Sequence, residues 1–456
     1  MLFCNGLMRR REFLLQAGGA AAATVFPAPA RLPNVLYLFS DEHRAQSWEP
    51  EVRTPNMARL AAQGVSLTRC VSNYPVCSPY RGMLLSGRWP FSTGVIDNGL
   101  PLPIEETSLG EVFQQAGYAT GYVGKWHLQG REGVNLPAGP QRHGFQFWRP
   151  WYNTNTHFDK SFYFDHEGRK QVPRGYNATL MTDQAIEFLD RRRAEPWFLM
   201  VSWNPPHPNY RDAPPEHLRR YDPATLQLRP NVSPHGAPLE RLRLHWQGYN
   251  AHITAVDHEL GRLMRHLDER KLADNTIVIY TSDHGDMMGS QGRMGKRLPH
   301  EESAIVPLVA RWPGHIGQGR QCPDLFGTID IYPSLCALAG IGVPKHCEGQ
   351  DLSGLFLSRP TGAPDSAFLM HIDKHGASGG IANPAPIFRG VRTTRYTYAA
   401  GETGPWLLYD NQEDPYQLHN LVHDAARRRL RSELEGLVAE WLRKAHDAFP
   451  WETAVG

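Results

Sequence analysis

Short apolar runs alternate along the chain with stretches of helical periodicity. The runs at 34–39, 118–123, 197–203 and 276–281 have the length and apolar character of buried β-strands. Between them, Thr54-Pro55 opens a helix that Gly64 closes, and apolar residues from Ile253 to Leu267 recur at helical spacing. This alternation predicts an α/β fold with a large, mostly parallel sheet flanked by helices.

The pattern changes after about Asp351, and no internal repeat is visible. Pro, Gly and Ser become frequent, and strand-like segments follow at 367–371, 387–391, 396–399 and 406–409. A terminal amphipathic helix is expected at about 425–445. We therefore expect a main α/β domain over 31–360 and a smaller C-terminal α+β subdomain over 361–456, with a small antiparallel sheet and a terminal helix.

The first 30 residues have the pattern of an export signal. Met8 to Ala30, "MRRREFLLQAGGAAAATVFPAPA", holds an arginine cluster, an apolar stretch rich in Ala and Gly, and a small-residue cleavage site. Arg10-Arg11 with the residues that follow resembles a twin-arginine signal. The alternative is a membrane anchor, but the apolar part is short and small-sided for a span. We expect a mature chain without a membrane span, in the periplasm or outside the cell.

Charge and cysteine content narrow the classes of partner. The chain has 48 basic and 46 acidic residues, a formal net charge of +2, which does not favour nucleic acid as a partner. Of its six cysteines, Cys4 lies within the predicted signal, and the spacing matches no zinc motif. If Cys77 has a chemical role, the four others can pair in three ways, and the sequence does not choose among them.

Acidic residues follow two of the predicted strands. Asp41 and Glu42 follow the first strand, and Asp283 follows the strand at 276–281. Ligands of open α/β sheets gather where the carboxyl ends of the strands meet. Carboxylates brought together there repel unless a cation holds them, and oxygen ligands favour a hard ion such as Ca²⁺ or Mg²⁺. The alternative is that each acid only caps the helix after its strand.

A cysteine stands at a predicted helix start, in "VCSPYRGMLLSGR" from Val76 to Arg88. We expect Ser78 to cap the helix and Pro79 to be its first residue, so that Cys77 directly precedes the helix. Free N–H groups and the helix dipole favour an anion there, and Arg81 in the first turn reaches the same anion. This predicts a pocket for sulfate or phosphate, against the alternative of an inert buried thiol.

The run from Cys77 to Arg88 resembles the type I sulfatase signature, Cys/Ser-x-Pro-x-Arg followed by Thr/Ser-Gly-Arg. The resemblance implies an alkaline-phosphatase-like fold, and conversion of Cys77 to formylglycine by a dedicated generating machinery. In that family the hydrated formylglycine supplies the nucleophile. The chain is thereby expected to be a sulfatase.

Further segments resemble sulfatase motifs in the family's order. "GYVGKWHL" implies active-site roles for Lys125 and His127, "NPPHPNY" implies one for His207, and a downstream lysine, Lys296, is expected to contact sulfate. "TSDHGDMMG" resembles the metal-binding segment, and the implied ligand set consists of Asp41, Glu42, Asp283 and His284.

Two of these metal-binding positions depart from the common pattern. Many relatives have two aspartates where this chain has Asp41-Glu42, and Asp-Asn where it has Asp283-His284. Glu42 is one methylene longer than aspartate, so direct ligation by Glu42 stays open. His284 either binds the ion or contacts the sulfate. The implied ion is Ca²⁺, with Mg²⁺ as the second choice.

The resemblance implies a division of labour in covalent catalysis. Asp283 helps to deprotonate the nucleophile, and Arg81, Lys125 and Lys296 offset charge on the sulfuryl oxygens together with the metal. His207 or Lys296 protonates the leaving alcohol, and His127 takes the proton whose loss releases sulfate. Two alternatives remain: a phosphonate monoester or phosphodiester hydrolase on the same fold, and a non-catalytic oxyanion-binding protein.

The expected substrate is a sulfated carbohydrate. Nine of the twenty residues from Phe145 to Phe164 are aromatic, against 10% of the chain, and aromatic faces stack on sugar rings. Trp148, Trp151 and Tyr152 at a pocket rim would favour a glycan. The alternative is that these rings pack in the core.

Overall fold

The structure is a computed structural model, and it describes residues 32–48, 50–130, 133–152, 156–191, 195–233, 237–372 and 385–455. The predicted export signal lies outside the described residues. Residues from Pro33 onwards form one compact unit, which is described here.

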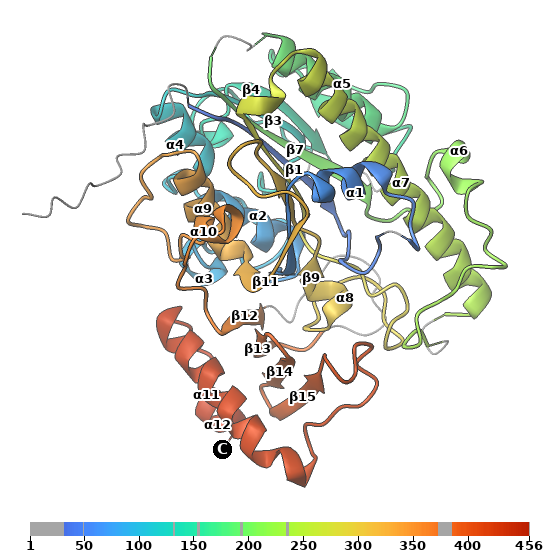
Figure 1. Ribbon diagram of the computed structural model, residues 1–456, viewed down its shortest axis with the longest axis vertical. Coiled ribbons are helices and arrows are strands. Elements are labelled where there is room, and N and C mark those ends of the chain that lie inside the picture. The colour runs from blue at the N-terminus through green and yellow to red at the C-terminus, as the bar shows by residue number, and fades with distance from the viewer. Residues whose placement is uncertain are drawn as a thin grey trace, which may run out of the picture. The chain divides into compact units, whose positions relative to one another are not determined.

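One large sheet runs through this unit (Figure 1). Its strand order is β11-β2-β10-β8-β1-β7-β3-β4-β5-β6, with β9 paired to β2 beside this path. The strands are β1 (Asn34–Asp41), β2 (Val65–Val71), β3 (Ala119–Lys125), β4 (Phe147–Tyr152), β5 (Phe162–Phe164), β6 (Lys170–Gln171), β7 (Trp197–Pro206), β8 (Thr276–Ser282), β9 (Ile305–Val306), β10 (Val309–Arg311) and β11 (Arg320–Gly327).

The centre of the sheet is parallel. β1 pairs in parallel with both β7 and β8, and β3 pairs in parallel with β7 and β4, whereas β10 runs antiparallel to β8. Every residue of β1, β3, β7 and β8 is buried. Parallel strands covered on both faces have near-continuous apolar sequences, which is why short apolar runs predicted them.

Helices cover both faces of the sheet, and β1 shows how its residues divide between them. Val35, Tyr37 and Phe39 pack in one cluster, and Leu36 and Leu38 pack in the other, as the two-residue period of a strand requires. The first face carries α2 (Cys77–Ser86), α4 (Leu109–Gln115), α9 (Ile331–Leu338) and α10 (Ser353–Leu357). The second carries α1 (Pro55–Ala62), α5 (Asn177–Arg191) and α7 (Leu239–Glu269).

A second, antiparallel sheet lies towards the C-terminus. Its strands, in spatial order, are β12 (Ser366–His371), β13 (Phe388–Thr393), β14 (Tyr396–Gly401) and β15 (Gly404–Asp410). They pack with α11 (Arg428–Lys444) and α12 (Trp451–Val455) (Figure 1). Asn73 ties this sheet to the main unit, because its Nδ2 donates to the Phe368 carbonyl at 2.7 Å and its own carbonyl accepts from Met370 N at 2.9 Å. The predicted fold class is confirmed, and the 360/361 domain boundary stays a prediction.

The remaining elements are short. They are α3 (Pro90–Thr93), α6 (Pro215–Leu218), α8 (Glu301–Ala304), and the 3₁₀ turns η1 (Pro140–Arg142), η2 (Ala273–Asn275), η3 (Thr328–Asp330) and η4 (Ala425–Arg427).

The start of α2 corrects one prediction. The helix begins at Cys77 with Val76 as its N-cap, so Cys77 is the first helical residue rather than the residue before the helix. Ser78 does not cap the helix, because its hydroxyl donates to the His127 carbonyl at 2.6 Å and its N–H donates to Asn98 Oδ1 at 3.0 Å. Tertiary partners therefore outweigh the local capping preference of serine.

The aromatic segment decides between the two alternatives that the sequence left open for it. Trp148, Trp151 and Tyr152 are all buried, with at most 4% of their surface exposed. Trp148 and Trp151 belong to the hydrophobic clusters on the two faces of the sheet. These rings fill the core, so they offer no exposed platform for a sugar.

Two further features concern the cysteines and the length of the helices. The described cysteines Cys70, Cys77, Cys322, Cys336 and Cys347 are all free thiols. Among the residues that the structure describes, no helix combines the length and apolar character that crossing a bilayer requires.

Gly124 tests how tightly the strands next to the cysteine are packed. Its φ is +111°, and a Cβ there would lie 2.0 Å from the Ser202 carbonyl oxygen of β7. We expect Gly124→Ala to cost roughly 2–5 kcal/mol, from overpacking and backbone strain together. Urea denaturation measures this loss.

Gly117→Ala is the matched control, because Gly117 also has a positive φ, +86°, but a Cβ there would meet nothing within 4 Å. We expect it to cost only about 1–2 kcal/mol. Equal losses in the two variants would contradict the close approach of β3 and β7.

Candidate functional site

The carboxyl ends of the central strands converge at one edge of the large sheet. Asp41 ends β1, Lys125 ends β3, His207 follows β7, and Asp283 follows β8. The remaining predicted residues come from α2 and from the segments after β1, β3 and β8. The structure brings all ten into one largely buried cluster: Asp41, Glu42, Cys77, Arg81, Lys125, His127, His207, Asp283, His284 and Lys296.

The Cys77 thiol lies at the centre of this cluster. His284 Nε2 and Lys296 Nζ each lie 3.3 Å from its Sγ, Lys125 Nζ lies at 3.7 Å, and Asp41 Oδ1 at 3.8 Å. Burial and Asp41 raise the pKa of the thiol, but the two lysines and His284 outweigh them and hold it well below its ordinary value. Position 77 is thus surrounded by groups that stabilise negative charge.

Arg81 joins the two aspartates. Its Nη2 lies 3.1 Å from Asp41 Oδ2 and 3.2 Å from Asp283 Oδ2. Its Nη1 donates to Ser202 Oγ at 2.8 Å and to the Lys125 carbonyl. The fork of the guanidinium therefore fixes β1, β3, β7 and the end of β8 relative to one another, which a lysine could not do.

The two aspartates have opposite pKa shifts. Burial opposes ionisation of Asp41, but Lys125, 2.6 Å away, and the other cations outweigh it and hold its pKa well below the ordinary value. Burial and the neighbouring Asp41 raise the pKa of Asp283 to about 6, against the opposing charges of His284 and Arg81. The cations thus favour the ionised form of Asp41, whereas burial and the charge of Asp41 favour the neutral form of Asp283.

Glu42 is the most strained acid of the cluster. Its backbone φ is +72°, a value that residues other than glycine rarely adopt. Its Oε1 pairs with Lys296 and lies 3.4 Å from His207 Nε2, whereas Oε2 is buried without a hydrogen bond. Burial outweighs the charge of Lys296, so that the Glu42 pKa lies well above its usual value, and the negative charges of Asp286 and Asp41 add to the shift.

These acids fit a hard cation. The ligand atoms of Asp41, Cys77, Asp283 and His284 lie within 4.8 Å of one another, as do those of Asp41, Glu42 and His207. A divalent cation would offset the repulsion among the buried carboxylates and satisfy the unbonded Glu42 Oε2. His284 also presents Nε2 to Cys77 Sγ, so it is placed beside the reacting position as well as beside Asp283.

The two other histidines flank the thiol differently. His127, at a φ of +58°, has its pKa lowered by burial and by Lys125, against a hydrogen bond with Cys77 that raises it. His207 Nδ1 donates to the Pro208 carbonyl at 2.7 Å, which leaves Nε2 directed at Glu42. Burial, Lys125 and Lys296 hold the His207 pKa well below its ordinary value.

The sequence did not single out several residues that hold this cluster. The hydroxyls of Ser202 and Tyr122 accept hydrogen bonds from Arg81 Nη1, and Asn98 Oδ1 accepts one from the Ser78 N–H. Asp286 Oδ1 accepts from Met288 N at 2.8 Å and Gly295 N at 2.9 Å, which shapes the loop that carries Lys296. Asp286 stands inside "TSDHGDMMG" as a second acid, which was a usable signal. The others emerge only once the strands are paired.

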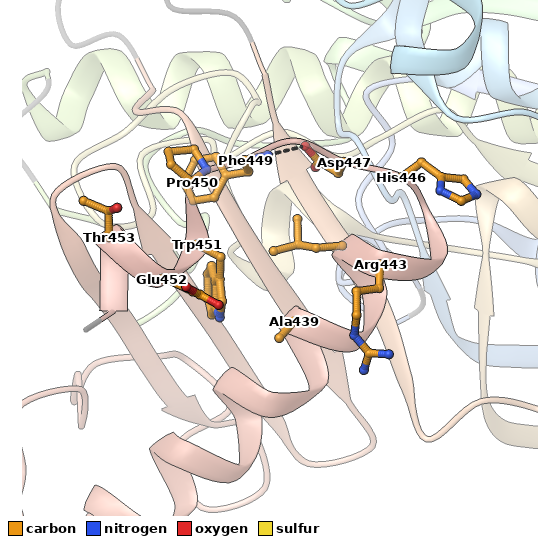
Figure 2. Close-up of a pocket in the computed structure, with 10 residues that line it drawn as sticks. Ala439, Arg443, His446, Asp447, Phe449, Pro450, Trp451, Glu452 and Thr453 are labelled. Carbon is orange, nitrogen blue, oxygen red and sulfur yellow. Dashed lines mark hydrogen bonds between the residues drawn. The ribbon is translucent and has the colours of Figure 1, made fainter.

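A separate cavity lies in the C-terminal part, next to α11 and α12 (Figure 2). Its volume is about 670 Å³, and its walls come from ten residues between Ala439 and Thr453. None of the ten cluster residues lines it.

Comparison with known proteins agrees with the motifs. Residues 33–341 match the family model Sulfatase, and residues 289–444 match the model of the N-sulphoglucosamine sulphohydrolase C-terminal region. An ulvan-active sulfatase of Formosa agariphila is 35% identical over 427 residues, covering 91% of this chain and 82% of the relative.

Solved structures share the fold. A protein solved with its substrate D-glucosamine-2-N,6-O-disulfate superposes with a TM-score of 0.83 at 22% identity, over 92% of this chain and all of the other. A phosphonate monoester hydrolase of Agrobacterium radiobacter superposes with a TM-score of 0.74 at 25% identity, over 91% of this chain and 95% of the other.

Proposed function

This chain belongs to the sulfatase family and is a sulfuric ester hydrolase, and we propose that it cleaves sulfate esters of a carbohydrate with formylglycine formed from Cys77 and a bound Ca²⁺. The observation that carries the proposal is the ring of cationic groups around position 77. Lys125, Lys296 and His284 lie within 3.7 Å of Cys77 Sγ, so the surroundings of position 77 suit an anionic sulfuryl group better than a neutral one.

The nucleophile is assigned to position 77. The Cys77 Sγ marks where the side-chain oxygens of formylglycine would lie. Hydrated formylglycine supplies one hydroxyl that attacks sulfur and a second hydroxyl whose deprotonation releases sulfate, and a cysteine or serine has no such second group. Asp283 is the acceptor for the proton of the first hydroxyl, because its carboxylate belongs to the same set of neighbouring atoms as Cys77 Sγ.

The metal is assigned to Asp41 and Asp283, whose ligand atoms fall in one set with His284, and Glu42, which falls in a separate set with Asp41 and His207, is a further candidate. Three carboxylates suit Ca²⁺, which takes six to eight oxygen ligands, and the flexible geometry of Ca²⁺ tolerates a glutamate beside aspartates. The ion would supply positive charge next to the sulfuryl oxygens. Arg81 and Lys125 pair with Asp41 and hold its carboxylate in place.

Proton transfer to the leaving alcohol is assigned to His207, with Lys296 as the alternative. His207 Nε2 faces the cluster, and the anionic sulfate of a bound substrate would favour its charged form. Burial opposes the charge of Lys296, but Cys77, Glu42 and Asp41 raise its pKa well above the ordinary value, so that it holds a proton to donate. His127, bonded to position 77, would accept the proton of the second hydroxyl.

The substrate class is supported by the relatives. The homologous sulfatases act on sulfated carbohydrates, and one neighbour was solved with a disulfated glucosamine. Export through the twin-arginine pattern at Arg10-Arg11 is part of this proposal, because it would bring the enzyme to extracellular glycans.

A phosphonate monoester or phosphodiester hydrolase is the second candidate, favoured by the shared fold of the Agrobacterium enzyme. The ratio of kcat/KM on a sulfate ester to that on a phosphodiester decides between them. A ratio above one supports the sulfatase, and a ratio below one supports the second candidate.

Cys77→Ala should abolish turnover and leave the fold intact, because position 77 supplies the nucleophile. Activity is measured on a sulfate ester, and folding by thermal denaturation. Cys336→Ala, which alters another fully buried cysteine, should stay active. A Cys77→Ala enzyme with activity within about tenfold of wild type would contradict the assignment of the nucleophile to position 77.

Chelation should remove activity, and Ca²⁺ should restore it better than Mg²⁺. Ca²⁺ should also raise the melting temperature, since a ligand of the native state at a hundred times its Kd adds about 2.7 kcal/mol. Asp41→Asn should lose this shift, whereas Asp330→Asn, a buried acid outside the cluster, should keep it. Full activity after exhaustive chelation, with no metal by elemental analysis, would rule the site out.

His207→Gln should slow sugar sulfates far more than activated aryl sulfates, because only poor leaving groups need a proton. The difference should be roughly a hundred- to ten-thousand-fold. His127→Gln should instead make kcat independent of the leaving alcohol, because its step follows the alcohol's departure. Steady-state kinetics on both substrate classes measure this, with Lys296→Met for comparison. An equal loss on both classes in His207→Gln would assign the acid elsewhere.

A further inference from the structure

His207 stands on a segment that has little structure of its own. β7 ends at Pro206, and the residues from His207 to Asp212 include only short turns. Within the segment, His207 Nδ1 donates to the Pro208 carbonyl at 2.7 Å, and the His207 N–H donates to the Asn204 carbonyl of β7 at 3.2 Å. The imidazole is thus tied to the backbone of its own segment, so its position depends on the groups that hold that backbone in place.

His157 holds the segment at His207 itself. Its Nε2 lies 2.8 Å from the His207 carbonyl oxygen. A carbonyl only accepts, so Nε2 carries the hydrogen, and Nδ1 accepts from Asn177 Nδ2 at 3.4 Å. The backbone N–H of His157 donates to Asp212 Oδ2 at 2.5 Å, at the far end of the same segment.

His252, on α7, holds the segment two residues further on. Its Nε2 donates to the Asn209 carbonyl at 3.2 Å, and its Nδ1 accepts from the Tyr176 hydroxyl at 2.7 Å. The rings of His157 and His252 meet edge to face, with centroids 4.4 Å apart. Both tautomers are therefore set by fixed partners, and the two rings form one unit beneath the segment.

Burial keeps both rings uncharged. Each has no exposed surface, and burial lowers the pKa of His157 to about 4 and that of His252 well below its ordinary value. Neutral rings can each donate one hydrogen bond and accept another, which is what this arrangement requires.

Tyr210, in the same segment as His207, also holds that segment in place, because its hydroxyl donates to Asp286 Oδ2 at 2.5 Å.

We propose that His157 and His252 are positioning residues for His207, which hold the backbone of its segment so that Nε2 faces Glu42 in the cluster around Cys77. Neither ring contacts Cys77 Sγ in the hydrogen bonds described, so His157 acts through the His207 carbonyl and His252 through the Asn209 carbonyl of the same segment. The expected effect on kcat rests on the proposed role of His207 as the acid. The expected position of the His207 imidazole does not depend on that role.

The test compares two substitutions at His157. His157→Gln keeps an N–H donor near the His207 carbonyl, and His157→Leu removes it. We expect His157→Leu to lower kcat on a sugar sulfate by about 10- to 100-fold with KM nearly unchanged, and to spare an activated aryl sulfate. His157→Gln should restore most of that loss. Ser108→Ala, which removes the capping box of α4, is the control for lost stability alone and should keep kcat.

A double variant separates positioning from general damage. If His157 acts through His207, His157→Leu combined with His207→Gln should be no slower than His207→Gln alone. Multiplied losses in the double variant, or equal losses for His157→Leu and His157→Gln, would overturn the proposal.

A crystal structure of His157→Leu makes the outcome independent of activity. A displaced His207 imidazole supports the inference even if His207→Gln shows no dependence on the leaving group, in which case only the proposed acid role fails. A His207 imidazole that stays in place within coordinate error refutes it.

Discussion

The guanidinium of Arg81 is the contact on which the rest of the site depends. It lies within 3.2 Å of carboxylates from two neighbouring strand ends, Asp41 and Asp283, and also bonds Ser202 of a third strand. Two carboxylates buried side by side repel each other, and the positive charge of Arg81 offsets that repulsion. Removing one member of a buried charged group typically costs about 3–5 kcal/mol, so Arg81 is a structural as well as a chemical necessity.

The parallel sheet explains why so much charge can gather at one place. Parallel strands end at the same edge, and β1, β3, β7 and β8 each deliver a polar residue there. Apolar side chains on both faces exclude water from the sheet itself. The strand ends therefore lie in a weakly screened environment, where lysines and carboxylates shift one another's pKa strongly.

Much of this could be predicted from the sequence, and the failures have physical reasons. The run from Asn34 to Phe39 predicted β1 because a strand covered on both faces is continuously apolar. The start of α2 was wrong by two residues, because Ser78 found tertiary partners in His127 and Asn98. Trp148 and Trp151 could have lain at a rim or in the core, and they lie in the core, because aromatic residues pack well in both places and periodicity does not distinguish the two.

The residues of the site also divide into those that the sequence predicted and those that it did not. Motif order placed all ten residues in one cluster, because a motif records which side chains must meet. It did not indicate Ser202, Tyr122 or the pair His157 and His252, which act through strand pairing and backbone carbonyls. Such supporting contacts depend on three-dimensional register, which local sequence does not encode.

The central claim is that position 77 carries an aldehyde when the enzyme is active. The direct measurement is the mass of the peptide that contains residue 77, taken from active enzyme purified from its native host, before and after reaction with a carbonyl-specific reagent. The account predicts the mass of formylglycine and its shift by the reagent. A fully active enzyme whose Cys77 peptide has the mass of an unmodified thiol, and does not react, would contradict it.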